Sequence, residues 1–420
     1  MQPKTLITSA QAASVPVTSS PAANVHITSH WKDAAAVERY RTGVSLHSHT
    51  SCSEESLKFV HMFLDMLPAA GHIMRRYERV CRQKHGLTLD FARAFWRPPM
   101  LPKMAFDLEA RQIRRLGLDP LVSITDHDTI EAPMLLRTVP SARHIPVSVE
   151  WSAPFGDTEL HLGIHNLPSA DGSEWMRRFA HYTAAAEAAR DCEDEFGARV
   201  EAMDARLIDM VRELHATPGV LVIFNHPVWD LHKVGETVHR REIVRFIAAA
   251  GNAIHALELN GLRHARENRE VMRLARDTGH LMISGGDRHG LEPNANINLT
   301  QARSFRDFVD EIRIERRSHV LFMEQYAKPW EGRILQSTLN AVTDFPDFIE
   351  GWQRWDERAF HPDAQGNLRP LSELWATGRA PWPLRFAIQT VKLGRSEMLR
   401  RGLSAAIRVS DSMPLEMELQ

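Results

Sequence analysis

Histidine and carboxylate residues in this sequence occur in short groups, each next to a run of apolar residues. The first group is His47-Ser48-His49, at the end of the apolar run 44–47. In an extended strand, residues i and i+2 project to the same side, so both imidazoles can face one ligand. Two neighbouring nitrogen donors suit a divalent metal ion, and Glu54 follows within reach of the same loop as an oxygen donor. This stretch therefore predicts part of a metal site.

One such pair could arise by chance among 22 histidines, so the other groups decide the interpretation. Each lies at the end of a predicted strand or just after it, except for one group that overlaps the start of its strand. They are Asp126-His127-Asp128, Glu150, Glu159-Leu160-His161, Asn225-His226-Pro227, Glu258-Leu259-Asn260 and Gly286-Asp287-Arg288-His289. Active sites of α/β barrels lie at the carboxyl ends of the strands. Seven predicted strands that carry His, Asp or Glu to one rim favour a shared metal site over scattered polar loop residues.

The elements that position these residues alternate between short apolar runs and amphipathic segments. The predicted strands are 44–47, 121–125, 146–150, 160–164, 220–224, 254–259 and 281–284. Segments 106–116 and 267–275 have apolar residues at helical spacing. Repeated strand–helix units predict an α/β fold with a parallel sheet, and the length of 420 residues is compatible with a closed barrel.

The chain is expected to divide into three parts. Residues 1–35 are predicted to be a flexible tail, 36–328 the barrel, and 329–420 a mostly helical C-terminal extension punctuated by Pro and Trp. Two connections, about 56–103 and 171–218, are too long for simple crossovers. We expect them to be helical insertions that could lie over the barrel mouth as a cap.

Composition narrows the class of protein. A net charge of −2 and a pI near 6.9 argue against bulk nucleic-acid affinity. No apolar run is long enough for a membrane span. Cys52, Cys81 and Cys192 form neither a disulfide framework nor a zinc knuckle, which favours a reducing compartment. We therefore expect a cytoplasmic protein with no membrane partner.

Taken in order, these motifs resemble the PHP (polymerase and histidinol phosphatase) superfamily of metal-dependent phosphoesterases. The likeness covers about residues 40–325 and includes His-x-His, Thr-Asp-His-Asp, Glu-Leu-His-Leu-Gly, Asn-His-Pro and Gly-Asp-x-His. It implies a distorted (β/α)7 TIM-like barrel with up to three divalent metal ions. The implied ligands are His47, His49, Glu54, His127, Glu150, His161, His226, Asp287 and His289. Many members have Asp where Glu54 stands, and Glu55 is the alternative ligand.

The chemistry of this ligand set does not depend on the family. Nitrogen and oxygen ligands without a thiolate favour Mn, Fe or Zn. Two such ions can hold a bridging hydroxide that attacks phosphorus. We expect catalytic roles for Asp126, His161 and Asp287. Either Asp126 or its neighbour Asp128 could orient the His127 imidazole, or simply cap the next helix.

Substrate contacts are expected beside the metals. Arg263 is the first candidate for binding phosphate and Arg288 the second, although Arg288 alternates with two ligands and should point away from them. Glu258 and Asn260 end a strand and are expected to line the pocket.

The most direct interpretation is a phosphomonoesterase acting on a small phosphorylated metabolite, either a nucleotide or a sugar or alcohol phosphate. Three alternatives remain. The Arg-rich stretch 74–82 would support a nuclease or nucleotide phosphodiesterase of the same superfamily. The leading His-x-His also occurs in amidohydrolases, although the pair Asp287-x-His289 speaks against that class. A metal-stabilised scaffold domain without catalytic activity is the third.

Overall fold

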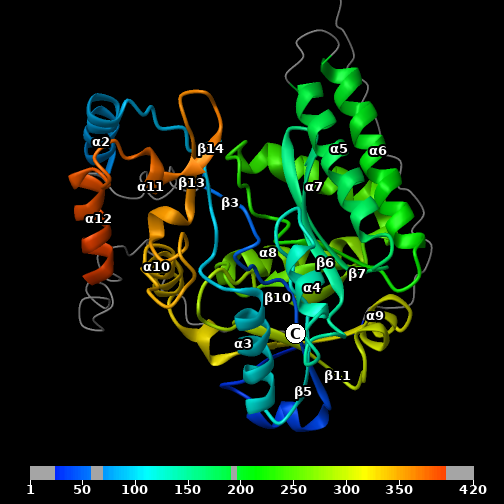
Figure 1. The fold of residues 1–420 in the computed structure, drawn as a ribbon. Helices are drawn as coiled ribbons and strands as arrows, with labels where there is room; N and C mark the ends of the chain where they lie inside the picture. The colour runs from blue at the N-terminus through cyan, green and yellow to red at the C-terminus, as the bar shows by residue number, and fades with distance from the viewer. Residues whose placement is uncertain (1–23, 58–69, 191–195, 394–420) are drawn as a thin grey trace, which may run out of the picture.

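The computed structural model describes residues 24–57, 70–190 and 196–393. They form a mixed α/β structure of three β-sheets surrounded by helices (Figure 1). Each of the seven predicted strands overlaps an observed strand, and both predicted amphipathic helices are present. Most of the expected N-terminal tail (residues 1–23), residue Cys192 and the end of the C-terminal extension lie outside the described residues.

The first sheet has five strands in the order β1–β12–β11–β2–β5. β2 pairs with β5, and β1 with β12, in parallel, whereas β11 runs antiparallel to both of its neighbours. The strands are β1 (Asn24–Ser29), β2 (Thr42–Ser45), β5 (Asp119–Val122), β11 (Asn296–Thr300) and β12 (Arg317–Phe322).

The second sheet has the order β10–β9–β8–β7–β6, with β8, β9 and β10 parallel. Its strands are β6 (Val147–Phe155), β7 (Thr158–Leu167), β8 (Leu221–Asn225), β9 (Ala256–Asn260) and β10 (Leu281–Gly285). The expectation of a parallel sheet is wrong for β7, which is antiparallel to β6 and β8. β6 and β7 form a hairpin whose tight turn begins at Gly156, where φ is +50°.

The two sheets are joined by backbone contacts at two places just after the ends of their strands, and we call these places the seams. After β2 and β10, Ser48 forms a bridge with Arg288, and Asp287 donates its N–H to the His47 carbonyl at 2.7 Å. After β5, His127 forms a bridge with Glu150 of β6. The loops that carry the predicted metal ligands are therefore held together by backbone hydrogen bonds.

Helices cover the outer faces of the sheets. They are α3 (Pro102–Arg115), α4 (Glu131–Arg137), α5 (Gly172–Arg190), α6 (Phe196–Ala216), α7 (Glu236–Ala250), α8 (Ala265–Thr278) and α9 (Phe305–Arg313), with short 3-10 helices η1 (Ala34–Arg39), η2 (Gly251–Ala253) and η3 (Glu324–Ala327). α8 ends at Gly279, where φ is +70°, and α9 begins with a capping box between Ser304 and Asp307. These local signals explain why both helices start and stop where they do.

The segment predicted at 171–218 forms the antiparallel pair α5 and α6, which stands beside β6 and β7 in Figure 1. Trp151 of β6 stacks on Phe179 of α5 with ring centroids 4.2 Å apart, and the Tyr182 hydroxyl donates to the Pro154 carbonyl at 2.6 Å. Because neighbouring residues of a strand point to opposite faces, these contacts lie on the face of β6 opposite Glu150.

The first insertion and the C-terminal extension form one unit, which occupies the left of Figure 1. Its sheet has the order β14–β13–β4–β3, and it has a hydrophobic core of its own that includes Cys81, Trp96, Leu371 and Trp375. Its elements are β3 (Glu55–Ser56), β4 (Phe95–Trp96), β13 (Ala359–Pro362), β14 (Leu368–Pro370), α2 (Ala70–His85), α10 (Trp330–Ala341), α11 (Leu371–Leu374), α12 (Trp382–Leu393) and the 3-10 helix η4 (Trp355–Glu357). We call this unit the C-terminal lobe.

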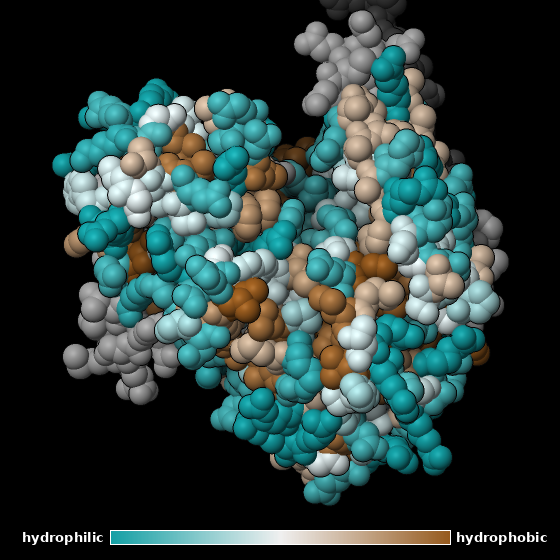
Figure 2. Space-filling view, viewed as in Figure 1, coloured by the Kyte–Doolittle hydropathy of each residue, from teal (hydrophilic) through white to brown (hydrophobic). Residues whose placement is uncertain are grey.

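One expected boundary needs correction. The tail predicted to reach residue 35 already contains β1, because β1 pairs along its full length with β12. The C-terminal extension, predicted to be mostly helical, also supplies the short strands β13 and β14. Figure 2 shows a largely hydrophilic face with a notch at the top, between the C-terminal lobe and the α5–α6 pair.

Candidate metal centre

Histidine and carboxylate side chains meet at the seams between the two main sheets. They form four overlapping groups, and within each group one ligand atom from every residue lies within 4.8 Å of the others. The groups are His47–His49–Asp287, His47–His226–Glu258, His49–Glu55–His127 and His127–Glu150–His161. Most of these side chains are buried. The structure therefore contains buried clusters that could hold metal ions.

The backbone turns sharply at three of these residues. His47, His226 and Asp287 have φ of +60°, +27° and +53°. They lie within two residues of the ends of β2, β8 and β10. Non-glycine residues rarely adopt positive φ, and such strain is concentrated at functional sites. In this protein the turn brings three side chains from separate strands to one centre.

Glu150 lies at the middle of the cluster. Its Oε2 is 2.9 Å from His47 Nε2 and 3.3 Å from the Nε2 atoms of both His49 and His127. Its Oε1 is 3.1 Å from His226 Nε2 and 3.4 Å from His161 Nδ1. Both oxygens of one buried carboxylate therefore face imidazole nitrogens.

The electrostatics of the cluster favour added positive charge. Burial alone would lower the pKa of His49, but Glu55, Asp287 and Glu150 raise it to about 10. Burial would also lower the pKa of His161, but Glu150 and Glu159 together raise it to about 10. These raised values show that the carboxylates attract cations strongly.

Two further imidazoles of the cluster, those of His127 and His226, behave differently. Burial lowers the pKa of His127 to about 4 and also lowers that of His226. Both are therefore neutral at pH 7, which is the form that binds a metal ion.

Two buried nitrogen atoms indicate what this arrangement can hold. His49 Nε2 and His161 Nδ1 have no hydrogen-bond partner among the described residues, although carboxylate oxygens lie 3.3–3.5 Å away. A buried polar atom without a partner is costly unless something else satisfies it. Neutral imidazoles and carboxylates are ligands for Mn, Fe and Zn, so the residues present fit divalent metal ions.

The structure separates the two alternative glutamates. Glu55 is 6% exposed, and its carboxylate lies 2.9 Å from His289 Nε2 and 3.2 Å from His49 Nδ1. Glu54 points to the surface, where its half-exposed side chain pairs with Arg97 at 2.8 Å. Glu55 begins β3 and pairs with Trp96 of β4, whereas Glu54 directly precedes the strand. Glu55 therefore replaces Glu54 in the candidate ligand set.

Asp126, for which a catalytic role was expected, contacts the loop that follows His49. It is fully buried, and its two carboxylate oxygens accept hydrogen bonds from the Thr50 N–H at 2.5 Å and the Thr50 hydroxyl at 2.7 Å. Asp126 thus fixes the loop that follows His49. Asp128, the other candidate for orienting the His127 imidazole, accepts the Ser152 N–H at 3.0 Å.

Glu258 and Asn260, which were expected to contact substrate, support the cluster from behind. Glu258 Oε1 lies 2.5 Å from His47 Nδ1, and its Oε2 accepts the His226 N–H at 2.9 Å. Asn260 Nδ2 donates to the same Oε2 at 2.9 Å. A side chain at Gly285 would overlap the Glu258 carboxylate, which explains one glycine of the Gly285-Gly286 pair.

The two candidate arginines diverge. Arg263 reaches the cluster, with Nη2 3.2 Å from Asp287 Oδ2 and its guanidinium 3.5 Å from the centre of the Trp229 ring. Arg288 is 5% exposed and points away from the metal ligands, donating to Glu109 Oε1 at 2.7 Å. The strand alternation described above predicted this direction for Arg288.

Several supporting residues were missed from the sequence. Glu109 of α3 partners Arg288, and no local motif marks it. Asn225 donates from Nδ2 to Glu150 Oε1 at 2.9 Å, and its position directly before His226 could have suggested this contact. Trp229 was visible as the aromatic residue three positions after His226, although its stacking on Arg263 depends on the fold.

Comparisons with known proteins give little further guidance. No protein-family model and no curated protein matches the chain. An amidohydrolase from Chromobacterium violaceum, with bound sulfate and no metal, is 19% identical over 46% of this chain and 83% of its own, with a TM-score of 0.30. A protein provisionally named as a metal-dependent phosphoesterase, from Bifidobacterium adolescentis, is 16% identical over 52% of this chain and 92% of its own, with a TM-score of 0.32. Neither likeness is close enough to carry an activity over to this chain.

Within the described part of the chain, no helix is both long enough and apolar enough to cross a bilayer.

Proposed function

We propose that this protein is a metal-dependent phosphoesterase, and specifically a phosphomonoesterase acting on a small phosphorylated metabolite. The observation that carries the proposal is the buried ring of imidazoles around Glu150 and Asp287, with Arg263 bound to Asp287 at its edge. Carboxylates and imidazoles supply a metal site, and an adjacent guanidinium supplies a phosphate contact.

The fold that would support this activity is a distorted (β/α)7 barrel of the PHP type. The order of neighbours is β2, β5, β6, β7, β8, β9 and β10, and the bridges at the two seams would complete the ring. In such a ring, His161 reaches the metal rim from the first half of β7 because that strand runs antiparallel.

The proposed ligands are His47, His49, Glu55, His127, Glu150, His161, His226, Asp287 and His289, with Glu258 as an added candidate. We propose up to three divalent ions, Mn, Fe or Zn, because the four groups overlap without containing a thiolate. Bound ions of this kind would act as Lewis acids toward the phosphoryl oxygens and lower the pKa of water.

Arg263 is proposed to bind the phosphate of the substrate. Stacking on Trp229 fixes the plane of its guanidinium, and Asp287 holds one of its two terminal nitrogens. Its Nε is buried without a hydrogen-bond partner among the described residues. A phosphate oxygen could satisfy such a donor, since guanidinium groups match phosphate in geometry and charge.

The C-terminal lobe is proposed to cap the site. It supplies Glu55 to the cluster, and the ring of Trp96 lies 6.2 Å from that of His289. Covering the rim in this way would exclude bulk water and restrict the size of the substrate.

The test is a screen for phosphate release across phosphorylated metabolites, using Mn-loaded protein. We expect hydrolysis of small monoesters by the wild type and a loss of metal and activity in Glu55→Gln. Glu54→Gln is the matched control, because it makes the same change one residue away and should retain both.

Two results would count against the proposal. Equal activity in the wild type and in His127→Ala would show that the proposed metal site is not the site of hydrolysis. A protein that folds normally and hydrolyses none of the phosphate esters would favour the scaffold alternative instead.

A further inference from the structure

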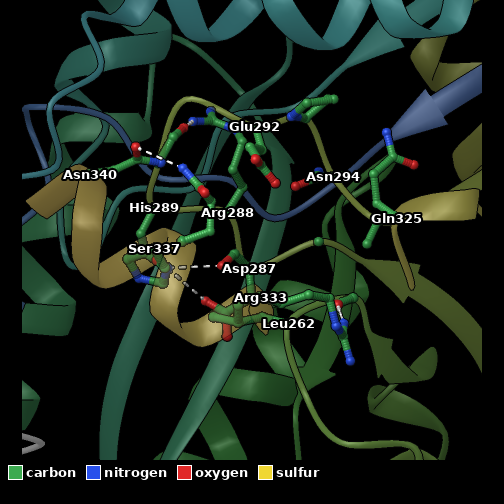
Figure 3. Close-up of a pocket in the computed structure, with 16 residues that line it drawn as sticks. Leu262, Asp287, Arg288, His289, Glu292, Asn294, Gln325, Arg333, Ser337 and Asn340 are labelled. Atoms are coloured by element: carbon green, nitrogen blue, oxygen red, sulfur yellow. Dashed lines mark hydrogen bonds and ion pairs between the residues drawn. The ribbon is translucent and has the colours of Figure 1, made fainter. Parts of the chain in front are cut away.

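A pocket opens beside the candidate metal centre, between the loop 286–295 and α10 of the C-terminal lobe. Asp287 and His289 line it on one side, and Gln336, Ser337 and Asn340 of α10 line it on the other. Figure 3 shows Ser337 and Asn340 on the helix, across from the loop that carries Asp287 and His289. A molecule in this pocket would therefore touch both the metal site and the lobe.

Helix α10 is held firmly at this position. Arg333 donates from Nη1 to the Gly261 carbonyl and from Nη2 to the Arg263 carbonyl, the latter at 3.1 Å. Its guanidinium also lies 4.3 Å from the centre of the Tyr326 ring. At the other end of the helix, a side chain at Gly290 would overlap the Asn340 amide. The wall that α10 provides is thus a fixed part of the site.

The lining of the pocket is polar, and both of its arginines, Arg288 and Arg333, already donate to other protein groups. The amide and hydroxyl groups of Gln325, Gln336 and Ser337 line it, and Glu292 places a carboxylate at its exposed side. The Arg288 charge is already matched by Glu109 behind the loop. Such groups exchange hydrogen bonds with hydroxyls, and the carboxylate disfavours a second anion.

The size of the pocket sets a further limit. Its volume is about 60 Å³, and one side is open. Since one water needs roughly 10–15 Å³ of such space, about four to six water-sized groups fit inside. No Trp, Tyr or Phe is found among the described residues that line it, so it offers none of the stacking platforms that usually hold nucleobases.

We propose that this pocket binds the leaving group of the substrate, and that this group is a small polyhydroxylated alcohol rather than a nucleoside. The inference rests on the proposed phosphomonoesterase function and narrows it to phosphate esters of polyols or sugars. The hydroxyls would contact Gln336 and Ser337, while the ester phosphate lies at the metal centre beside Asp287.

The test compares glycerol 3-phosphate with adenosine 5′-monophosphate as substrates of the Mn-loaded full chain. We expect wild-type kcat/KM to favour glycerol 3-phosphate. Ser337→Leu, which fills the pocket, should lower that value by about tenfold or more, chiefly through KM. Gln336→Ala, which removes a hydrogen-bonding group without adding bulk, should lower it in the same direction. Lys328→Leu is the matched control, because it adds leucine at an exposed position outside the pocket, and it should behave as wild type.

The outcomes separate the two proposals. Preference for the nucleotide, or unchanged kinetics in both Ser337→Leu and Gln336→Ala, would overturn the assignment of the pocket. If no monoester is hydrolysed, the proposed function fails, and calorimetric binding of glycerol 3-phosphate then decides the pocket alone. Weaker binding in Ser337→Leu than in Lys328→Leu would support the pocket, and equal binding would overturn it.

Discussion

The buried pair formed by Glu109 and Arg288 provides a quantitative test of how the loop 286–295, which carries two candidate metal ligands, is held in place. Glu109 is 0% exposed and Arg288 5% exposed, with Arg288 Nε 2.7 Å from Glu109 Oε1. Glu109 also accepts from the Ser45 hydroxyl at 3.1 Å and from the Asn294 N–H at 3.2 Å. Burial raises the pKa of the Glu109 carboxyl, while Arg288 lowers it.

Replacing Glu109 by Leu should lower the free energy of unfolding by about 3–5 kcal/mol. The reason is that Arg288 would remain buried without a counter-charge, which is the expected cost of breaking a buried pair from one side. The double variant Glu109→Leu/Arg288→Met removes both charges and should lie within about 1–2 kcal/mol of the wild type. The two single changes would then be strongly non-additive.

The measurement is urea unfolding of the wild type, both single variants and the double variant in the presence of a chelator. Asp119→Asn is the matched control, because Asp119 pairs with Arg41 at 3.0 Å where both side chains are at least half exposed. That change should cost less than about 1 kcal/mol. A loss below about 1 kcal/mol in Glu109→Leu, or simple additivity in the double variant, would refute the reasoning.

Three further predictions follow from contacts elsewhere. Arg333→Met should raise KM by about tenfold with little change in kcat, because Arg333 holds the backbone that carries Arg263. Equal KM values in this variant and the wild type would exclude the positioning role. Gly285→Ala should reduce metal affinity and stability, since its methyl group would overlap Glu258; full metal content at limiting metal would contradict this. His255 Nδ1 accepts a backbone N–H of β8 at 2.8 Å, and burial holds its pKa well below the unfolded value of about 6.5. At this position the folded state therefore binds fewer protons, so His255 should contribute a loss of about 1 kcal/mol per pH unit as the pH falls below 6.5. The stability of His255→Gln should fall less steeply than that of the chelated wild type, and parallel pH curves for the two proteins would be the contrary result.

Local pattern predicted much of the candidate site, and the resemblance to a known family selected the individual ligands. His47, His49, His127, Glu150, His161, His226, Asp287 and His289 belong to groups near predicted strand ends, and the structure brings them close together. This works because strand periodicity sets which way neighbouring side chains point, and barrel-like folds collect strand ends at one rim. The same alternation correctly predicted that the Arg288 side chain points away from the ligands.

Other features were decided only by the tertiary structure. The choice of Glu55 over Glu54 depends on pairing of β3 with β4, whose residues lie about 40 positions further along the chain. The direction of β7 depends on its hairpin with β6, and neither the Glu109 contact nor the shared core of the C-terminal lobe has a local signal. The sequence by itself thus determined which residues could bind metal, because side-chain chemistry and strand period are local. Only the fold decided which of them meet, because pairing between distant segments sets register and facing, and no local pattern encodes that.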